Sequence, residues 1–257
     1  MTKTEAFRLI GGIDEKYVEA AEDCAPRKLN QKKKVYLRVL ASAAACLVLA
    51  AGILAGGMRL AKGSNEIPLS GSSAGVTARY IDKAPVRSGD ASLVWLDEDE
   101  IFTRWNTAIF RGTVTDVQNI EVDFGGAKRY QAIAKVRVSR VIRGPFGEDD
   151  VVPVLLPSTV GDGSWAEDCD IIETIRVGIE GIFMPIVYDD ENNFFEMNGV
   201  TLDKRDLAPC GLADGMRWTF FETPHRLIYA SSAYPTLAAR AAKTLDEVEA
   251  FIWEKIK

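Results

Sequence analysis

The hydrophobic pattern contains one segment without any polar face. Residues 39–58 carry no charged side chain, and Ser42 is their one ordinary polar residue. A helix of about 20 residues spans about 30 Å, the thickness of the hydrocarbon core of a bilayer. A buried helix of a folded domain would show a polar face, and a cleaved signal peptide has a shorter apolar region. We therefore expect one uncleaved transmembrane helix over residues 37–60.

The two flanks of this segment differ in charge, which predicts its orientation. Arg59 and Lys62 are the nearby basic residues that follow it. Cytoplasmic flanks carry the excess of Lys and Arg. We expect a single-pass cell-membrane protein with residues 1–36 in the cytoplasm and residues 61–257 outside. The basic residues that precede the segment, with no acid among them, are Arg27, Lys28, Lys32, Lys33, Lys34 and Arg38.

Inside the apolar segment, Gly52 and Gly56 form a G-x-x-x-G step. Small residues at this spacing let two helices approach closely, so the step favours a helix dimer. Segments rich in Ala and Gly also contain it by chance.

The cytoplasmic tail has helical spacing. Residues 2–24 predict two short helices separated at Gly11 and Gly12, with Asp14 as the N-cap of the second. Helices this short are marginal alone in water. The tail is then either a partly helical extension or a segment that folds on a cytoplasmic protein partner.

Apolar periodicity is missing just after the membrane segment. Residues 61–91 are rich in Gly, Ser and Pro, which predicts a flexible linker.

The remaining residues, 92–257, form the expected extracytoplasmic domain, which is mainly β. Ala134 and Val136 alternate with Lys135 and Arg137, so one strand face is apolar and the other charged. Further strands are expected at 107–122, 150–157, 178–188, 192–200, 216–223 and 226–233.

Two helices are expected in this domain. Asp97 caps a short helix over residues 97–105, and Thr244 with Glu247 forms a capping box before a helix that ends near residue 256. The fold class is therefore mainly β (α+β), with a β-barrel or sheet, a C-terminal amphipathic helix and one preceding transmembrane helix. The apolar face of the last helix consists of Leu245, Val248, Ile252 and Ile256.

Residues 107–187 carry a motif order that resembles OB-like barrels of the netrin and TIMP type. The segments that carry it are IFRGTVTDV, KVRVSRVIRGPFGEDDVVPVLLP and RVGIEGIFM. The whole chain also resembles a family of uncharacterised bacterial single-pass proteins, which join a tail like IGGIDEKYVEAA, a basic run and an alanine-rich anchor to a similar ectodomain. Similar tails occur on anti-sigma-like regulators. The resemblance implies this architecture and no particular activity.

Charge argues against nucleic acid as a partner. The formal net charge is −6, and residues 61–257 alone carry 31 acidic against 21 basic residues. Binding phosphate backbones requires a concentrated positive surface.

Few residues suit catalysis. His225 is the single histidine, and no nucleophile motif accompanies it. The number of His and Cys residues excludes a multi-histidine zinc site, and phosphate- and dinucleotide-binding loops are absent from the sequence. We expect a non-enzymatic protein without a cofactor.

One loop nevertheless concentrates carboxylates beside an aromatic ring. Trp165, Glu167, Asp168 and Asp170 are ligand-binding candidates, as a lip for a sugar or peptide or as a glycosidase-like pair. A solvated acidic loop is the alternative.

Two further groups suggest stabilising sites. Asp189, Glu191 and Asn193 place oxygen atoms at alternate positions and are calcium candidates, although a turn between strands explains them equally well. Cys169 and Cys210 are the two cysteines expected outside the membrane, where a disulfide can persist.

Three functions are compatible with these patterns. The first is a binding or sensing module for a protein or cell-wall ligand, favoured because catalytic motifs are absent. The second is an anti-sigma-like regulator that acts through the tail, although residues 1–36 are few for a complete sigma-binding domain. The third is an extracytoplasmic hydrolase that uses the carboxylates of residues 165–170.

Overall fold

The computed structural model describes residues 65–83, 94–161 and 171–257, which belong to one compact unit, Ser64–Lys257. The tail, the expected transmembrane helix with its glycine step, and residues 162–170 lie outside the described residues. In the three described ranges no helix is both long and apolar enough to cross a membrane.

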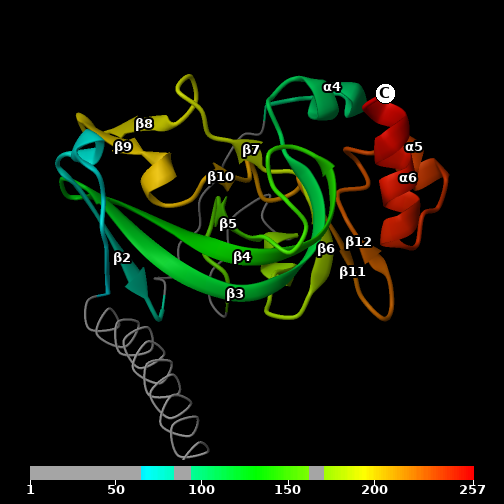
Figure 1. The fold of residues 1–257 in the computed structure, drawn as a ribbon, viewed down its shortest axis with the longest axis horizontal. Coiled ribbons are helices and arrows are strands. Elements are labelled where there is room, and N and C mark those ends of the chain that lie inside the picture. Colours follow the sequence, from blue (N-terminus) through cyan, green and yellow to red (C-terminus); the bar gives the residue numbers. More distant parts are fainter. Residues whose placement is uncertain (1–64, 84–93, 162–170) are drawn as a thin grey trace, which may run out of the picture. The chain divides into compact units, whose positions relative to one another are not determined.

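One long β-hairpin organises the domain (Figure 1). β3 (Ile109–Phe124) and β4 (Ala127–Arg143) pair antiparallel along their length, with three register shifts. The turn residues Gly125 and Gly126 have φ values of 63° and 104°. Glycine adopts such values without strain, and a two-residue turn of this kind matches the twist of the strands. Strands of 16 and 17 residues are far longer than the usual ~5–6, so the hairpin serves two cores.

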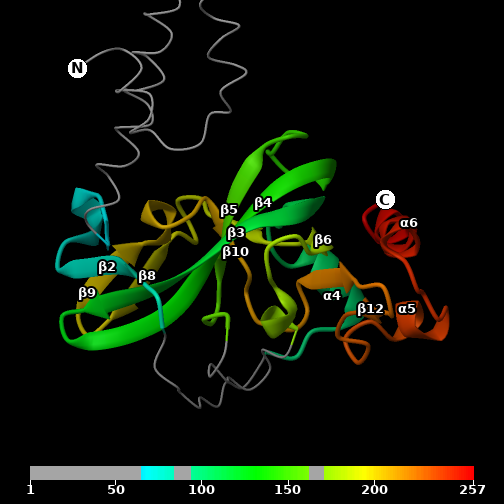
Figure 2. The same cartoon turned by 90° about the horizontal axis from the view of Figure 1, so that it is seen from below.

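A curled sheet surrounds the first half of this hairpin (Figure 2), with the strand order β12-β11-β6-β3-β4-β5-β10-β7. Hydrogen bonds of 2.9 Å from Ala108 N to Pro185 O and from Val187 N to Asn106 O connect β7 back to the residues before β3. The fold is thus mainly β, as the alternation predicts, and the sheet is curled into a half-barrel. The short strands are β5 (Val151–Leu156), β6 (Glu180–Phe183), β7 (Ile186–Val187), β10 (Cys210–Gly211), β11 (Thr219–Glu222) and β12 (Leu227–Ile228).

Short helices complete the main core. α6 (Leu245–Lys255) packs on β6 and β11 with Val248 and Phe251 buried, and its capping box of Thr244 and Glu247 is confirmed. The Asp97 cap of the first helix is also confirmed. The other helical segments beside this core are α4 (Glu98–Thr103), η3 (Ile172–Thr174) and α5 (Pro235–Ala239).

A buried polar cluster lies within this core. The Asp214 carboxylate accepts bonds of 2.9 and 2.7 Å from the Arg217 guanidinium and one of 2.7 Å from Trp218 Nε1. The Tyr234 hydroxyl donates to the Arg217 carbonyl, and burial raises the pKa of Tyr234 well above its ordinary value. The cluster satisfies polar groups that would otherwise be costly to bury.

A second core covers the far half of the hairpin. β8 (Phe194–Met197) and β9 (Val200–Asp203) form a separate two-stranded sheet, followed by η4 (Lys204–Asp206). These elements lie over the end of β3 and β4 near the Gly125–Gly126 turn (Figure 1). The buried residues of this core are Ile67, Val76, Ala78, Ile120, Val122, Phe124, Ile133, Leu155, Leu202, Leu207 and Ala208.

Part of the expected linker belongs to this second core. β1 (Glu66–Ile67), η2 (Gly71–Ser73) and β2 (Val76–Ile81) precede β3, and β2 pairs antiparallel with its far half. The Asp206 carboxylate accepts bonds from Ser70 N at 3.0 Å, Ser70 Oγ at 2.8 Å and Ser73 Oγ at 2.5 Å. The prediction of a flexible linker was wrong for residues 65–83, because their serines are bonded to the domain.

Candidate ligand-binding pocket

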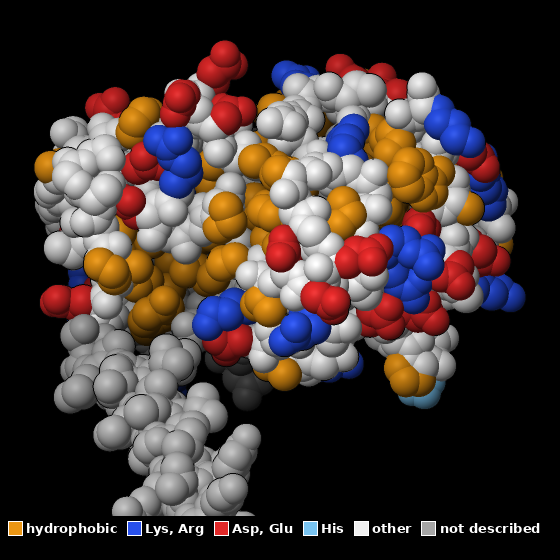
Figure 3. Space-filling view, viewed as in Figure 1, with side chains coloured by type: hydrophobic (Ala, Val, Ile, Leu, Met, Phe, Trp, Pro, Cys, Tyr) orange, Lys and Arg blue, Asp and Glu red, His pale blue; other side chains and the backbone are white. Residues whose placement is uncertain are grey.

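An open pocket of about 290 Å³ lies where the two cores meet. Strands β4, β5 and β10 contribute to it from the large sheet, and β8, β9 and η4 from the smaller layer. Hydrophobic side chains gather on this face between the β8–β9 end and the rest of the sheet (Figure 3). Ligand pockets favour such junctions between packed units.

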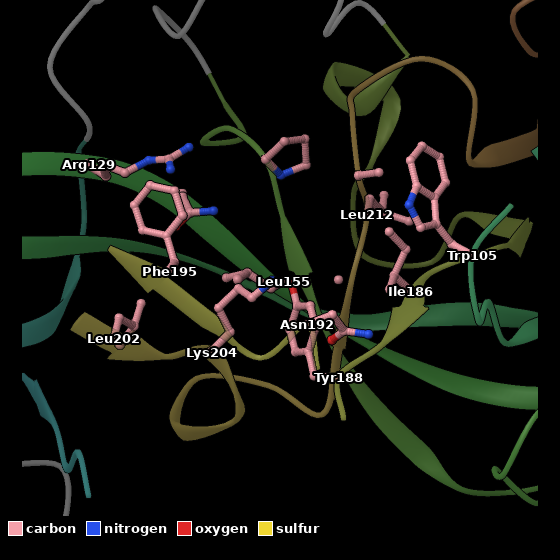
Figure 4. A pocket seen from close by; sticks show the side chains of 14 residues that line it. Trp105, Arg129, Leu155, Ile186, Tyr188, Asn192, Phe195, Leu202, Lys204 and Leu212 are labelled. Carbon is pink, nitrogen blue, oxygen red and sulfur yellow. The ribbon is translucent and has the colours of Figure 1, made fainter. Parts of the chain in front are cut away.

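Arg129 lies at one end of the pocket beside Phe195 (Figure 4). Arg129 stands on β4 opposite Val122 of β3, and its guanidinium lies 4.5 Å from the centre of the Phe195 ring. That ring packs in turn on Phe124, with centroids 5.6 Å apart. Burial lowers the pKa of Arg129, and no ion pair joins it to another described residue.

Lys204 is the second cation of the pocket. Its Nζ atom lies 4.2 Å from the centre of the Tyr188 ring, and its backbone N–H donates to Asn193 O at 2.8 Å. Burial lowers the pKa of Lys204, and the charge of Asp203 opposes this shift. Arg205 binds the Asp203 carboxylate itself, at 2.9 Å from Nη2, so this carboxylate is already paired.

Tyr188 forms part of the pocket wall and depends on a glycine. Its backbone N–H donates to Pro209 O at 3.0 Å. A Cβ atom at Gly211 would lie only 2.1 Å from the Tyr188 hydroxyl oxygen, so the ring position requires glycine there. Burial raises the pKa of Tyr188, with a smaller contribution from Cys210. The hydroxyl is therefore neutral and remains a donor at neutral pH.

The opposite end of the pocket is apolar. Trp105, Ile186 and Leu212 lie together there, away from Arg129 (Figure 4). The Trp105 ring packs against buried Trp218 with centroids 5.3 Å apart, which fixes this wall to the main core.

Two side-chain amides line the pocket, each held by a hydrogen bond. Gln131 Nε2 donates to Leu156 O at 3.2 Å, and Asn192 Nδ2 donates to Val187 O at 3.0 Å. Of the lining residues that the structure describes, none is an acid, a histidine, a cysteine, a serine or a threonine. The pocket thus pairs cationic, amide and phenol donors with an apolar wall, an arrangement suited to holding a ligand.

The residues predicted as a carboxylate lip are not among these. Trp165, Glu167, Asp168 and Asp170 lie outside the described residues, so this site stays a prediction. His225 is exposed on the turn between β11 and β12.

The calcium candidates form a turn. The Asp189 carboxylate accepts from Glu191 N at 3.0 Å, while the Asp189 carbonyl accepts from Asn193 N at 3.1 Å. Asn193 is fully buried, whereas Glu191 is exposed. Within the described part of the chain, no three His, Cys, Asp or Glu residues group closely enough to hold a metal ion. Calcium binding at Asp189, Glu191 and Asn193 stays a prediction.

The structure describes one of the two cysteines of the predicted disulfide. Cys210 is a free, buried thiol whose Sγ donates to Pro153 O at 3.5 Å, and burial raises its pKa to about 12. Cys169 lies outside the described residues, so the pairing stays a prediction.

The sequence patterns did not indicate this pocket. Arg129 and Gln131 belong to the polar face of an alternating strand, which is normally solvated. The aromatic residues Tyr188 and Phe195 are the sequence feature that could have indicated the pocket, because arginine and lysine side chains stack on such rings.

Neither a protein-family model, nor a curated protein, nor a solved structure matches this chain.

Proposed function

We propose that this chain is a single-pass membrane protein whose extracytoplasmic, OB-like domain is a non-enzymatic binding or sensing module. The observation that carries the proposal is the composition of the pocket between the two cores. Its described lining combines aromatic and aliphatic walls with a few oriented polar groups and lacks the usual nucleophiles and carboxylate bases. Such a lining favours retention of a ligand over its conversion.

The wider architecture supports the same proposal. The apolar segment over residues 37–60 and its basic flank favour an anchor with residues 61–257 outside the cell membrane. The half-barrel is consistent with an OB-like fold, and OB folds bind ligands on a face of the barrel. The expected ligand is a protein or a cell-wall component.

A blocked pocket tests this proposal. Ala213 is exposed at the pocket, so Ala213→Trp fills the mouth without burying a new ring in the core. Ala239→Trp, at an exposed position of α5, is the matched control. The full-length chain in detergent would be incubated with soluble cell-wall fragments and peptides, and its melting temperature measured.

Binding in the pocket predicts that a fragment raises the melting temperature of the wild type and of Ala239→Trp but not that of Ala213→Trp. Equal stabilisation of all three would place the ligand elsewhere. Cleavage of a fragment by the wild type would refute the non-enzymatic assignment.

A further inference from the structure

Two partly buried cations face the pocket without a carboxylate partner. Neither the Arg129 guanidinium nor the Lys204 ammonium makes an ion pair or hydrogen bond with a residue that the structure describes. Each is held over an aromatic ring instead, Arg129 over Phe195 and Lys204 over Tyr188. Burial lowers the pKa of both groups, because keeping them charged in this partly buried site costs free energy.

A shortage of carboxylates does not explain this. Residues 61–257 carry 31 acidic against 21 basic residues. Elsewhere in the domain, partly buried or neighbouring charges pair closely, such as Lys128 with Glu121 at 3.0 Å and Arg140 with Glu249 at 2.9 Å. The pocket is thus a local positive site in an acidic domain, and an incoming anion would supply the missing charge.

Both cations carry donors suited to such an anion. The Arg129 guanidinium lies 4.5 Å from the centre of the Phe195 ring, and its planar set of N–H donors matches the oxygen atoms of a carboxylate or phosphate. Lys204 contributes three further donors. The apolar wall at Trp105, Ile186 and Leu212 lies at the opposite end (Figure 4).

We propose that the pocket binds a small amphipathic oxyanion, with its carboxylate or phosphate group at Arg129 and Lys204 and its apolar body against Trp105 and Ile186. This inference rests on the proposed function and names the ligand class of the same pocket. A volume of about 290 Å³ is at the small end of ligand pockets, so the apolar body is about the size of one aromatic ring.

Calorimetric titration of the full-length chain in detergent tests this inference with three probes that share a ring. Phenyl phosphate and phenylacetate carry an oxyanion, and phenylacetamide is the neutral counterpart. We expect the better oxyanion to bind about tenfold or more tightly than the amide, because hydrogen bonds to charged groups are the stronger ones. The relative affinity of phosphate and carboxylate identifies the preferred head group. Added salt should weaken oxyanion binding.

Charge-removing variants assign the effect to the pocket. Arg129→Gln and Lys204→Gln should each weaken oxyanion binding about tenfold or more. Arg226→Gln and Lys243→Gln remove exposed charges elsewhere in the domain and should leave it unchanged. Melting temperatures of the four variants show whether the fold is intact, and we expect at most a small loss of stability at Arg129 or Lys204, since each loses a contact with an aromatic ring but no ion pair.

Three results would overturn the inference: equal affinity for amide and oxyanions, unchanged oxyanion affinity in the folded Arg129→Gln and Lys204→Gln variants, or absence of binding by either oxyanion at millimolar concentration. Ala213→Trp separates this failure from that of the proposed function. If Ala213→Trp abolishes binding of cell-wall fragments or peptides while the oxyanion probes are ignored, the pocket remains a binding site and only the ligand class is wrong.

Discussion

At the scale of single residues, Gly211 shows how the pocket depends on a missing side chain. A Cβ atom there would lie 2.1 Å from the Tyr188 hydroxyl oxygen and 3.0 Å from Leu155 O. The Tyr188 ring in turn lies under the Lys204 ammonium. One hydrogen in place of a methyl group therefore positions both an aromatic wall and a cation.

We expect Gly211→Ala to displace the Tyr188 ring and to lower the free energy of unfolding by about 1–3 kcal/mol, the usual cost of overpacking. Urea denaturation measures this change. Gly71→Ala is the control, because nothing lies within 4 Å of a Cβ at that position. Adding Tyr188→Phe to Gly211→Ala should recover part of the loss, since it removes the clashing oxygen. Wild-type stability of Gly211→Ala would contradict this packing.

The Asp214 cluster makes a second residue-level prediction. Asp214→Ala would leave the buried Arg217 guanidinium without its counter-charge, and we expect a loss of about 3–5 kcal/mol in the free energy of unfolding. Asp246→Ala removes the exposed partner of Arg111 and should cost only about 0–1 kcal/mol. Thermal unfolding of both variants compares the two losses. Similar losses would show that burial of the Asp214 pair contributes nothing.

The pocket also shows what single positions do not encode. The alternation in β4 correctly predicts that Ala134 and Val136 lie on the apolar, buried face of the strand. It cannot predict that β8, far along the chain, covers Arg129 on the polar face with Phe195. Long-range contacts of this kind decide whether a charge is solvated or lines a site, and a periodic pattern contains no information about them.

At the scale of elements, local rules succeed where an element is long or capped. The caps of α4 and α6 follow from sequence because a capping box is complete within four residues. The two-residue strands β7, β10 and β12 are too short to show alternation and depend on their neighbours in the sheet. Composition misled at β2, because serine and glycine around it suggested a linker although Val76 and Ala78 are buried.

The hydrogen bonds between Asp206 of η4 and two serines test whether residues 65–83 are held to the folded domain. Asp206→Ala removes the acceptor of three hydrogen bonds from Ser70 and Ser73. We expect faster amide hydrogen exchange in β1, η2 and β2, measured by mass spectrometry, with little change in α6. Asp190→Ala, which removes an exposed partner of Arg205, is the control. Unchanged exchange in residues 66–81 would show that these bonds do not hold the segment.

The junction of β9 and η4 predicts a pH dependence. Hydrogen bonds from Arg205, the largest cause, lower the pKa of Asp203 below its ordinary value. A carboxyl group with a lowered folded-state pKa binds fewer protons when folded, so its stabilising contribution is present above about pH 4 and is lost as the pH falls further. We expect Asp203→Asn to reduce the free energy of unfolding at neutral pH and to flatten its decline below pH 4.

Chemical denaturation from acid to neutral pH measures both slopes. Asp190→Asn should retain the wild-type slope, because that carboxylate is almost fully exposed. A wild-type slope in Asp203→Asn would assign the acid sensitivity to another group.

At the scale of the whole molecule, the predicted membrane topology rests on the sequence of residues 27–60. It does not depend on any contact within the folded domain. Reporter fusions test it: alkaline phosphatase after Lys257 should be active, because that enzyme requires an extracytoplasmic location, and the same reporter after Lys34 should be inactive. Replacing Lys32, Lys33 and Lys34 with Gln should reduce the difference. The opposite pattern would invert the proposed topology.

The length of the β3–β4 hairpin has a thermodynamic consequence. The same two strands run through both cores: β3 contributes Val114 to the main core and Ile120 to the second core. Unfolding of either core would expose one face of strands that the other core also needs. A slip of one residue at the Gly125–Gly126 turn would turn the side chains of both cores outward together. We therefore expect the two cores to unfold as one cooperative unit, with a single calorimetric transition for residues 64–257.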